Sequence, residues 1–419
     1  MKSNKPARSN GAILFSLFFA VLIDMLGVGI VIVVMAPYIK DSVTLFATEV
    51  SQDMRNTIYL VMVALFGGAQ FFGAPLLGGL SDNYGRKRLV ILSMIGGAFG
   101  YLLFSLGTLW AVLPLLFVGR IVTGFFSGSV SILYSIIADL SRPENRAKNF
   151  GILGAAFGVG FVVGPALGGY LADPTVVSWF NESTPFFAAM ALSLLSALLI
   201  YLTVPETFAR KHHEEKVRLN LLQGFLNIKE ALQIKGLTPI LVVLFFIYLG
   251  FTFFTQFSTV YLQDELNFSL NDLSKFFAFI GLVLFLTQMG LIRLVTSYFS
   301  APQIVRVVLL TLSAGLFIFI LPDNKTSLYW IAPIIPLSFG LLQPNVLSII
   351  SNSASSEIQG QILGIQQSIR SLAFFFPPMV SAYISTLDRT LPNKVGALFV
   401  FIAWCVFLIF YRKSSTPKM

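Results

Sequence analysis

Long apolar stretches separated by short polar loops fill almost the whole chain. Twelve of these stretches have about the 20 residues that a helix needs to cross a bilayer, so the sequence predicts twelve transmembrane helices. Their approximate bounds are 11–38, 57–79, 89–107, 110–138, 150–172, 185–204, 238–262, 274–294, 304–321, 328–350, 361–386 and 395–411. One long polar interruption divides them six and six.

This division predicts an all-α membrane protein with an N-terminal six-helix bundle (1–204), a cytoplasmic central loop (205–236) and a C-terminal six-helix bundle (237–419). In the central loop, apolar residues recur at helical spacing among basic ones, which suits an amphipathic helix on the inner leaflet. A partly ordered linker between the bundles is an equally good interpretation.

Composition and charge placement support a membrane protein with a defined orientation. The 419 residues are 56% hydrophobic and 11% charged, with a mean hydropathy of +0.82, whereas about a quarter of the residues in soluble proteins are charged. Of the 28 Lys and Arg residues, 20 fall in loops on one side of the predicted helices and 6 on the other. Since basic loops stay in the cytoplasm, both termini are expected there. Bases scattered through short loops do not suggest a nucleic-acid partner.

Residue usage argues against several other kinds of protein. A single cysteine, Cys405, excludes an intrachain disulfide, and the only two histidines, His212 and His213, are adjacent in a charged stretch. We therefore expect no metal site, no cofactor and no catalytic residues. An enzyme would need a catalytic set near one interface, and a channel would need a lining repeated around a pore; the sequence shows neither pattern.

The loop between the second and third stretches carries the most specific motif. Its glycines let helices approach closely, its acid can cap a helix or form an ion pair, and its basic triplet favours the cytoplasmic side. The spacing of these residues resembles the loop between helices 2 and 3 of the major facilitator superfamily. The residues are Gly78, Asp82, Gly85, Arg86, Lys87 and Arg88. The resemblance implies the major facilitator fold, two pseudo-symmetric bundles of six helices, with this loop as a conformational latch of the inner side in the outward-open state.

The fifth stretch contains a face of small residues. Gly160, Gly164 and Gly168 are four residues apart and share one helix face, and Pro165 interrupts the helical hydrogen bonding. Such a face admits a neighbouring backbone in many membrane helices. The order of these residues, completed by Gly169, also resembles the fifth-helix motif of drug:proton antiporters, which implies export rather than import.

Asp24 is the only carboxylate deep within a predicted helix. A carboxylate at this depth costs about 2.5–3.5 kcal/mol on insertion scales, so it usually faces a cavity and has a function. Asp24 with Gly27 and Gly29 resembles the first helix of tetracycline-type exporters. Arg120 resembles a fourth-helix arginine to which the family assigns proton transfer. The implied fold makes the two helices neighbours, so Asp24 and Arg120 could pair in proton coupling; a purely structural role is the alternative for each.

Arg370 lies in the eleventh stretch, and the second half of the chain has no acid at that depth to neutralise it. It could bind an anionic group of a substrate, because a guanidinium matches a carboxylate, or it could have structural partners. Neutral amides in the same half offer further hydrogen bonds to a substrate. They are Gln256, Gln343, Asn345 and Gln366.

Further matches in both halves extend the resemblance to tetracycline-type exporters over nearly the whole chain. We therefore expect a secondary active transporter, a proton-coupled antiporter that exports a drug-like compound or an anionic metabolite such as a siderophore by alternating access. The alternative is a symporter or uniporter that imports a small organic solute. The expected partners are the substrate, protons and the lipid of a bacterial-type inner membrane, with a monomer as the working unit.

Overall fold

The computed structural model describes residues 10–46, 49–141, 143–207, 238–352 and 359–411, together with residues 226 and 229. The regular structure of this part of the chain is entirely helical. The amphipathic helix expected in the central loop lies almost wholly outside the described residues.

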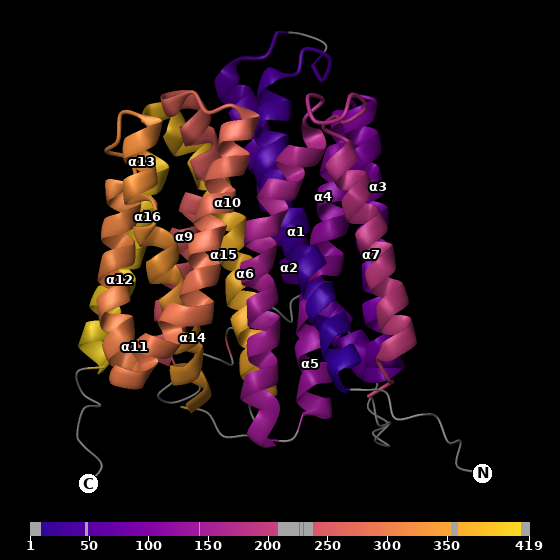
Figure 1. Cartoon of the computed structure of the whole chain (residues 1–419), viewed down its shortest axis with the longest axis vertical. Helices are drawn as coiled ribbons and strands as arrows, with labels where there is room; N and C mark the ends of the chain where they lie inside the picture. Colours follow the sequence, from indigo (N-terminus) through magenta and orange to yellow (C-terminus); the bar gives the residue numbers. More distant parts are fainter. Residues whose placement is uncertain are drawn as a thin grey trace.

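Seven helices precede the central loop (Figure 1). They are α1 (Asn10–Asp41), α2 (Gln52–Tyr84), α3 (Arg86–Leu109), α4 (Leu113–Ser127), α5 (Val130–Leu140), α6 (Pro143–Ala172) and α7 (Thr184–Thr203). The elements after it are α9 (Thr238–Leu266), α10 (Leu270–Leu286), the π-helical turn η1 (Thr287–Leu291), α11 (Ile292–Tyr298), α12 (Ala301–Ile318), α13 (Lys325–Ile331), α14 (Ile334–Asn352), α15 (Gln359–Leu387) and α16 (Leu391–Tyr411). We refer to α1–α7 as the first half and to α9–α16 as the second half.

All twelve predicted segments are helical, which confirms the predicted all-α membrane fold. Among the described residues, eleven segments are long and apolar enough to cross a bilayer. The segment at 361–386 lies in α15, which is long enough but carries glutamines, serines and Arg370 along its first half. This polarity suits a helix that packs against α2, α9 and α16 inside the protein.

Three of the predicted segments are interrupted, which the apolar pattern does not reveal. The fourth consists of α4 and α5, the eighth contains η1 between α10 and α11, and the tenth consists of α13 and α14. Pro333, between α13 and α14, has no N–H to donate to the preceding turn. At Gly128, between α4 and α5, an added Cβ would lie 2.4 Å from the backbone nitrogen of Ala74, so α2 passes close to this interruption.

The two halves meet along two seams. Within the first half, α1 packs on α6 and α3 packs on α4 and α7; within the second, α9 packs on α16 and α12 on α14. Across the halves, α2 packs against α15 and α6 against α10, and Figure 1 shows α6 and α10 side by side. We call these contacts the α2–α15 seam and the α6–α10 seam.

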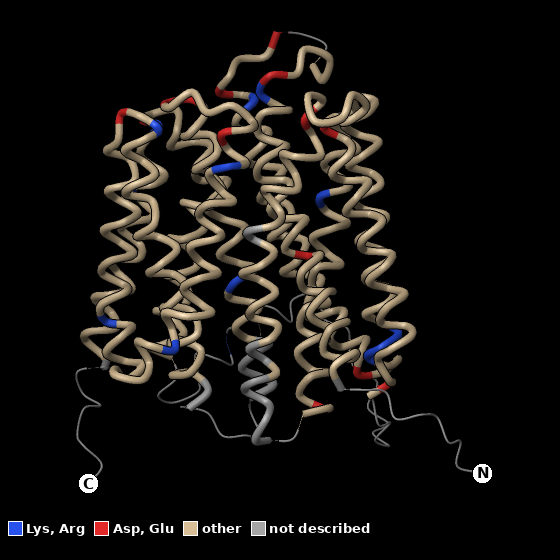
Figure 2. Tube along the Cα trace, in the orientation of Figure 1, with Lys and Arg blue, Asp and Glu red and all other residues tan. Residues whose placement is uncertain are grey.

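Charged residues gather at the two ends of the helices and are rare between them (Figure 2). This distribution is expected for a protein whose middle is surrounded by hydrocarbon. We call the end where α1 is followed by α2 the outer end, and the end where α2 is followed by α3 the inner end, following the orientation that the basic loops predict.

Candidate functional site

Asp24 is partly buried on α1 and is hydrogen-bonded to α4. The Ser127 hydroxyl donates to Asp24 Oδ2 over 2.5 Å, and Ser127 Oγ in turn accepts from Gln70 Nε2 on α2 over 2.9 Å. Beside them is a cavity of about 10 Å³, lined in part by Asp24, Tyr101 and Ser127. This is about the space that one water molecule needs. The carboxylate therefore has both a protein donor and room for a water.

Arg120 is buried on α4, with 2% of its surface exposed. Its guanidinium lies 4.2 Å from the ring centre of Phe66, and its Nε has no hydrogen-bond partner. No ion pair joins Arg120 to Asp24 in this structure, because the Asp24 carboxylate is turned to Ser127. A cation over an aromatic face is stabilised by the ring quadrupole, so Phe66 substitutes in part for the predicted acidic partner.

Arg370 reaches from α15 across to the first half. Its Nη2 lies 3.8 Å from the sulfur of Met25, the residue after Asp24, and its guanidinium stacks 4.4 Å from the ring centre of Phe157 on α6. Arg370 and Arg120 are both close enough to act electrostatically on Asp24. The Arg370 guanidinium thus meets the first half through a sulfur and an aromatic ring, and among the described residues it forms no ion pair with an acid.

The four candidate binding amides differ in burial and in the hydrogen bonds that they already make. Gln366 lies one turn before Arg370 on the same helix face and donates to the Tyr248 hydroxyl over 3.2 Å. Asn345 instead donates to the carbonyl of Leu341 in its own helix over 2.7 Å. Gln256 is buried with its Oε1 lacking a hydrogen-bond partner, and Gln343 is partly buried. Gln366 is therefore the candidate amide that shares a helix face with Arg370.

The glycine face of α6 packs on α1. A Cβ added at Gly160, Gly164 or Gly168 would lie 2.4–3.1 Å from atoms of Met25, Leu26 or Ile30, respectively. Pro165 lies in the same interface, where an added Cβ on Gly29 would come within 2.6 Å of its Cδ. These residues allow close helix packing; the link between the motif and export remains a prediction.

Gly169 faces the second half instead. A Cβ built on it would lie 1.6 Å from the Ser274 hydroxyl oxygen on α10. The α6–α10 seam can therefore close in this way only if residue 169 has no side chain.

We expect Gly169→Ala to open the α6–α10 seam and to slow transport. Overpacking costs about 1–3 kcal/mol, which corresponds to a shift of about 5- to 150-fold away from this conformation. Transport rates in liposomes measure the effect, and Ser274→Gly in the same chain should restore the rate by removing the clashing hydroxyl. Gly154→Ala, on the same helix with open space around it, is the control. If the Gly169→Ala/Ser274→Gly double variant still transported slowly, the effect of Gly169→Ala would not come from the clash at the α6–α10 seam.

At the inner end, the motif loop is bonded to other parts of the first half and to Glu206, three residues after α7. Arg86 forms ion pairs with Asp82, at 3.6 Å, and with Asp139, and its backbone N–H donates to Glu206 over 2.9 Å. Gly85 has φ +101°, a conformation that favours glycine, and ends α2 by donating to the Ser81 carbonyl.

The remaining residues of the motif loop are Lys87, Arg88 and Gly78. Lys87 donates to the Tyr201 carbonyl over 2.6 Å, Arg88 is exposed, and a Cβ on Gly78 would meet only the Ser131 hydroxyl at 4.0 Å. All these partners lie in the first half. The loop thus stabilises the first half in this conformation, and its latching of the inner side in another conformation remains a prediction.

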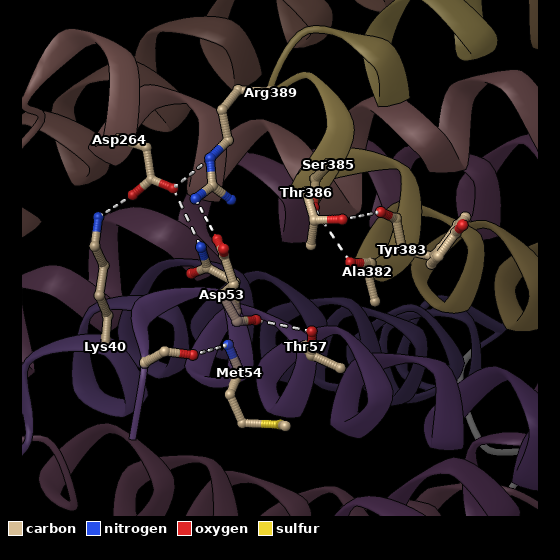
Figure 3. A network of polar contacts seen from close by, with 12 residues as sticks. Lys40, Asp53, Met54, Thr57, Asp264, Ala382, Tyr383, Ser385, Thr386 and Arg389 are labelled. Atoms are coloured by element: carbon tan, nitrogen blue, oxygen red, sulfur yellow. Dashed lines mark hydrogen bonds and ion pairs between the residues drawn. The ribbon is translucent and has the colours of Figure 1, made fainter. Parts of the chain in front are cut away.

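At the outer end, ion pairs join the two halves (Figure 3). Asp264 on α9 pairs with Lys40 of α1 and accepts from Asn56 Nδ2 of α2 over 3.2 Å. Arg389, between α15 and α16, lies 2.5 Å from Asp53 of α2 and 3.7 Å from Asp264. We call these five residues the outer network. It holds the outer ends of α1 and α2 against the second half.

Comparison with known proteins identifies the family. The family profile described as Major Facilitator Superfamily matches residues 17–378. The chain is 27% identical to the tetracycline resistance protein, class H, of Pasteurella multocida over 98% of both chains. It is 26% identical to the quinolone resistance protein NorA of Staphylococcus aureus, over 97% of this chain and 98% of that one.

Solved structures show the same fold. The human organic anion transporter MFSD10 (TETRAN) superposes with a TM-score of 0.75 at 20% identity, over 96% of this chain and 100% of that one. A D-xylose–proton symporter superposes with a TM-score of 0.73 at 16% identity, over 96% and 97%. At these low identities the similarity shows the fold alone. It is the fold of the family whose profile matches the chain.

Proposed function

The chain belongs to the major facilitator superfamily, and from this premise we propose that it is a proton-coupled antiporter that exports a small organic molecule by alternating access. Membership of this family makes it a multi-pass membrane transporter and not an enzyme. The observation that supports proton coupling is Asp24, an acid far from both helix ends that is hydrogen-bonded to Ser127 beside a water-sized cavity.

The outer network supports the alternating-access part of the proposal. It ties the halves together at the outer end, while the ion-pair partners of the motif loop at the inner end lie in the first half. This conformation is therefore closed toward the outside. Carriers of this kind work by rocking one bundle against the other around a midplane site, so breaking the outer network would accompany release to the outside.

Export is supported by the fifth-helix motif and by the names of the two relatives, which are resistance proteins. Import by the same fold is the alternative, since a proton symporter is among the structural neighbours. The charge distribution of 20 basic residues against 6 supports an inner-membrane protein with cytoplasmic termini. The driving force in this proposal is the proton gradient, with no cofactor.

The charges near Asp24 favour some substrates over others. Antiport requires that the substrate and the proton oppose each other's binding, and this coupling is reciprocal. A cationic group near Asp24 favours the ionised carboxylate and so releases the proton. An anion on Arg370 would neutralise the guanidinium and favour the protonated carboxyl, which leads to binding of anion and proton together. The proposed antiporter thus fits a cationic or zwitterionic drug-like cargo better than an anionic metabolite.

The replacement of Arg370 by glutamine distinguishes the two substrate classes. If the cargo is a carboxylate, Arg370→Gln should weaken binding by about 1.5–3 kcal/mol, the value for a hydrogen bond to a charged group, and Arg370→Lys should recover only part. If the cargo is cationic or neutral, affinity should stay the same or rise. Calorimetric titration of the purified variants with organic carboxylates, tetracycline and a quinolone measures this; unchanged carboxylate affinities would exclude an anion site at Arg370.

The proposed function is tested with purified protein in liposomes that contain a pH-sensitive dye. With a proton gradient imposed, tetracycline, a quinolone or a carboxylate should accumulate against its own gradient while protons move in the opposite direction. Movement of protons and cargo in the same direction would instead establish symport. Accumulation without any proton movement would overturn proton coupling.

A further inference from the structure

A row of three hydrogen bonds leads from Asp24 to the second half. Ser127 donates to Asp24 over 2.5 Å, Gln70 Nε2 donates to Ser127 Oγ over 2.9 Å, and Ser371 Oγ donates to Gln70 Oε1 over 3.1 Å. The row passes from α1 through α4 and α2 to α15. Ser127, Gln70 and Ser371 expose at most 4% of their surface, so bulk water does not compete for these bonds.

The direction of the donors fits an ionised Asp24. A carboxylate without its proton only accepts, so the Ser127 hydroxyl points to Asp24, the Gln70 amide group to Ser127, and the Ser371 hydroxyl to the Gln70 carbonyl. A protonated Asp24 still has an oxygen that accepts from Ser127, but it has lost its negative charge. The Ser127–Asp24 bond is then no longer charge-assisted, and a neutral hydrogen bond is about half as strong.

The change would reach α15 at a sensitive place. Ser371 is the residue after Arg370. About one turn before Gln70, α2 contacts α15 closely, since a Cβ on Gly67 would lie 2.8 Å from the backbone of Phe374. Hydrogen bonds in a low dielectric strengthen one another along a chain. Weakening of the Ser127–Asp24 bond therefore also weakens the Gln70–Ser371 bond, which crosses the α2–α15 seam.

We propose that Gln70 is a positioning residue that couples the proton on Asp24 to the α2–α15 seam. With Asp24 ionised, the Gln70–Ser371 bond is at its strongest and holds the halves together; with Asp24 protonated, this bond weakens and α15 moves more easily. The charged and titratable groups facing Asp24 are Arg120 on α4, Arg370 on α15 and Tyr101 on α3. The proposal rests on the proposed function, in which Asp24 carries the proton.

The test uses Gln70→Leu, which keeps the size of the side chain and removes its hydrogen bonds. In liposomes, substrate exchange without a proton gradient should stay within about twofold of wild type, whereas accumulation driven by a pH gradient should fall at least about tenfold. The pH dependence of transport should become flatter. Ser105→Ala is the control, since this buried hydroxyl donates within its own helix to the backbone carbonyl of Tyr101.

Ser371→Ala tests the same bond from the other side and is the milder change if Gln70→Leu does not fold. It should reduce pH-driven accumulation as Gln70→Leu does, and the double variant should be no worse than the stronger single one, because both remove the same interaction. Additive losses in the double variant would overturn the role of Gln70. So would pH-driven accumulation at the wild-type level in both single variants while Asp24→Asn is uncoupled. Either result would leave the proposed function standing. Coupling that persists in Asp24→Asn would overturn the proposed function itself.

Discussion

Replacing Asp24 with asparagine is expected to abolish accumulation driven by a pH gradient while downhill exchange of substrate continues. Asparagine has nearly the same shape and still accepts a hydrogen bond from Ser127, so the packing between α1 and α4 is retained. It cannot bind and release a proton at accessible pH. In liposomes, the ratio of internal to external substrate should fall to about one, the value that passive equilibration gives.

The control for this experiment is Asp173→Asn, because Asp173 lies in an outer loop, where Thr175 is its hydrogen-bond donor. This variant should accumulate substrate as wild type does. If Asp24→Asn still concentrated substrate in response to pH, another group would have to carry the proton. Asp139, which pairs with Arg86 near the inner end, would be the next residue to replace.

Replacing Asp264 with asparagine is expected to shift the protein toward the conformation that opens to the outside. The change removes the acid between Lys40 and Arg389, whose side chains expose only 17% and 26% of their surface. Loss of one charged hydrogen bond costs about 1.5–3 kcal/mol, which corresponds to a shift of about 10- to 150-fold. The distance between spin labels on Asp41→Cys and Glu265→Cys, with Cys405 replaced by serine, should increase.

The matched control is Asp272→Asn. It breaks a pair with Lys325 at the same end of the molecule, at 2.5 Å, but both partners belong to the second half. The distance between the labels should not change in this control. An unchanged distance in Asp264→Asn as well would mean that the outer network does not hold the halves together.

The sequence was sufficient to predict the helices but not the contacts between them. The transmembrane segments follow from apolar length alone, because a bilayer leaves a helix of about 20 residues as the simplest way to satisfy the backbone. The interruption at η1 was not predictable, since a π-helical turn leaves the apolar pattern unchanged. The motif loop was identified correctly as a charged turn, and Gly85 has the backbone conformation that only glycine adopts easily.

The site shows a clearer limit. Asp24 was found because a lone acid in an apolar run is conspicuous, whereas Gln70, Ser127 and Ser371 look like ordinary polar residues of membrane helices. The partners of the outer network are far apart in the chain, 224 positions for Lys40 and Asp264, and no local spacing indicates such pairs. The pairing that Asp24 and Arg120 could make is not formed in this structure for a related reason: the fold brings Ser127 to the carboxylate and Phe66 to the guanidinium.

The polar first half of α15 has a consequence for how the protein is made. An arginine at the centre of a helix costs about 2.5–3.5 kcal/mol when the segment leaves the translocon for lipid, and Arg370 with its neighbouring glutamines gives α15 this burden. Its contacts with α2 and Met25 belong to a half that is synthesised earlier. Insertion of α15 therefore depends on the first half already being in the bilayer, and the order of synthesis along the chain supplies that condition.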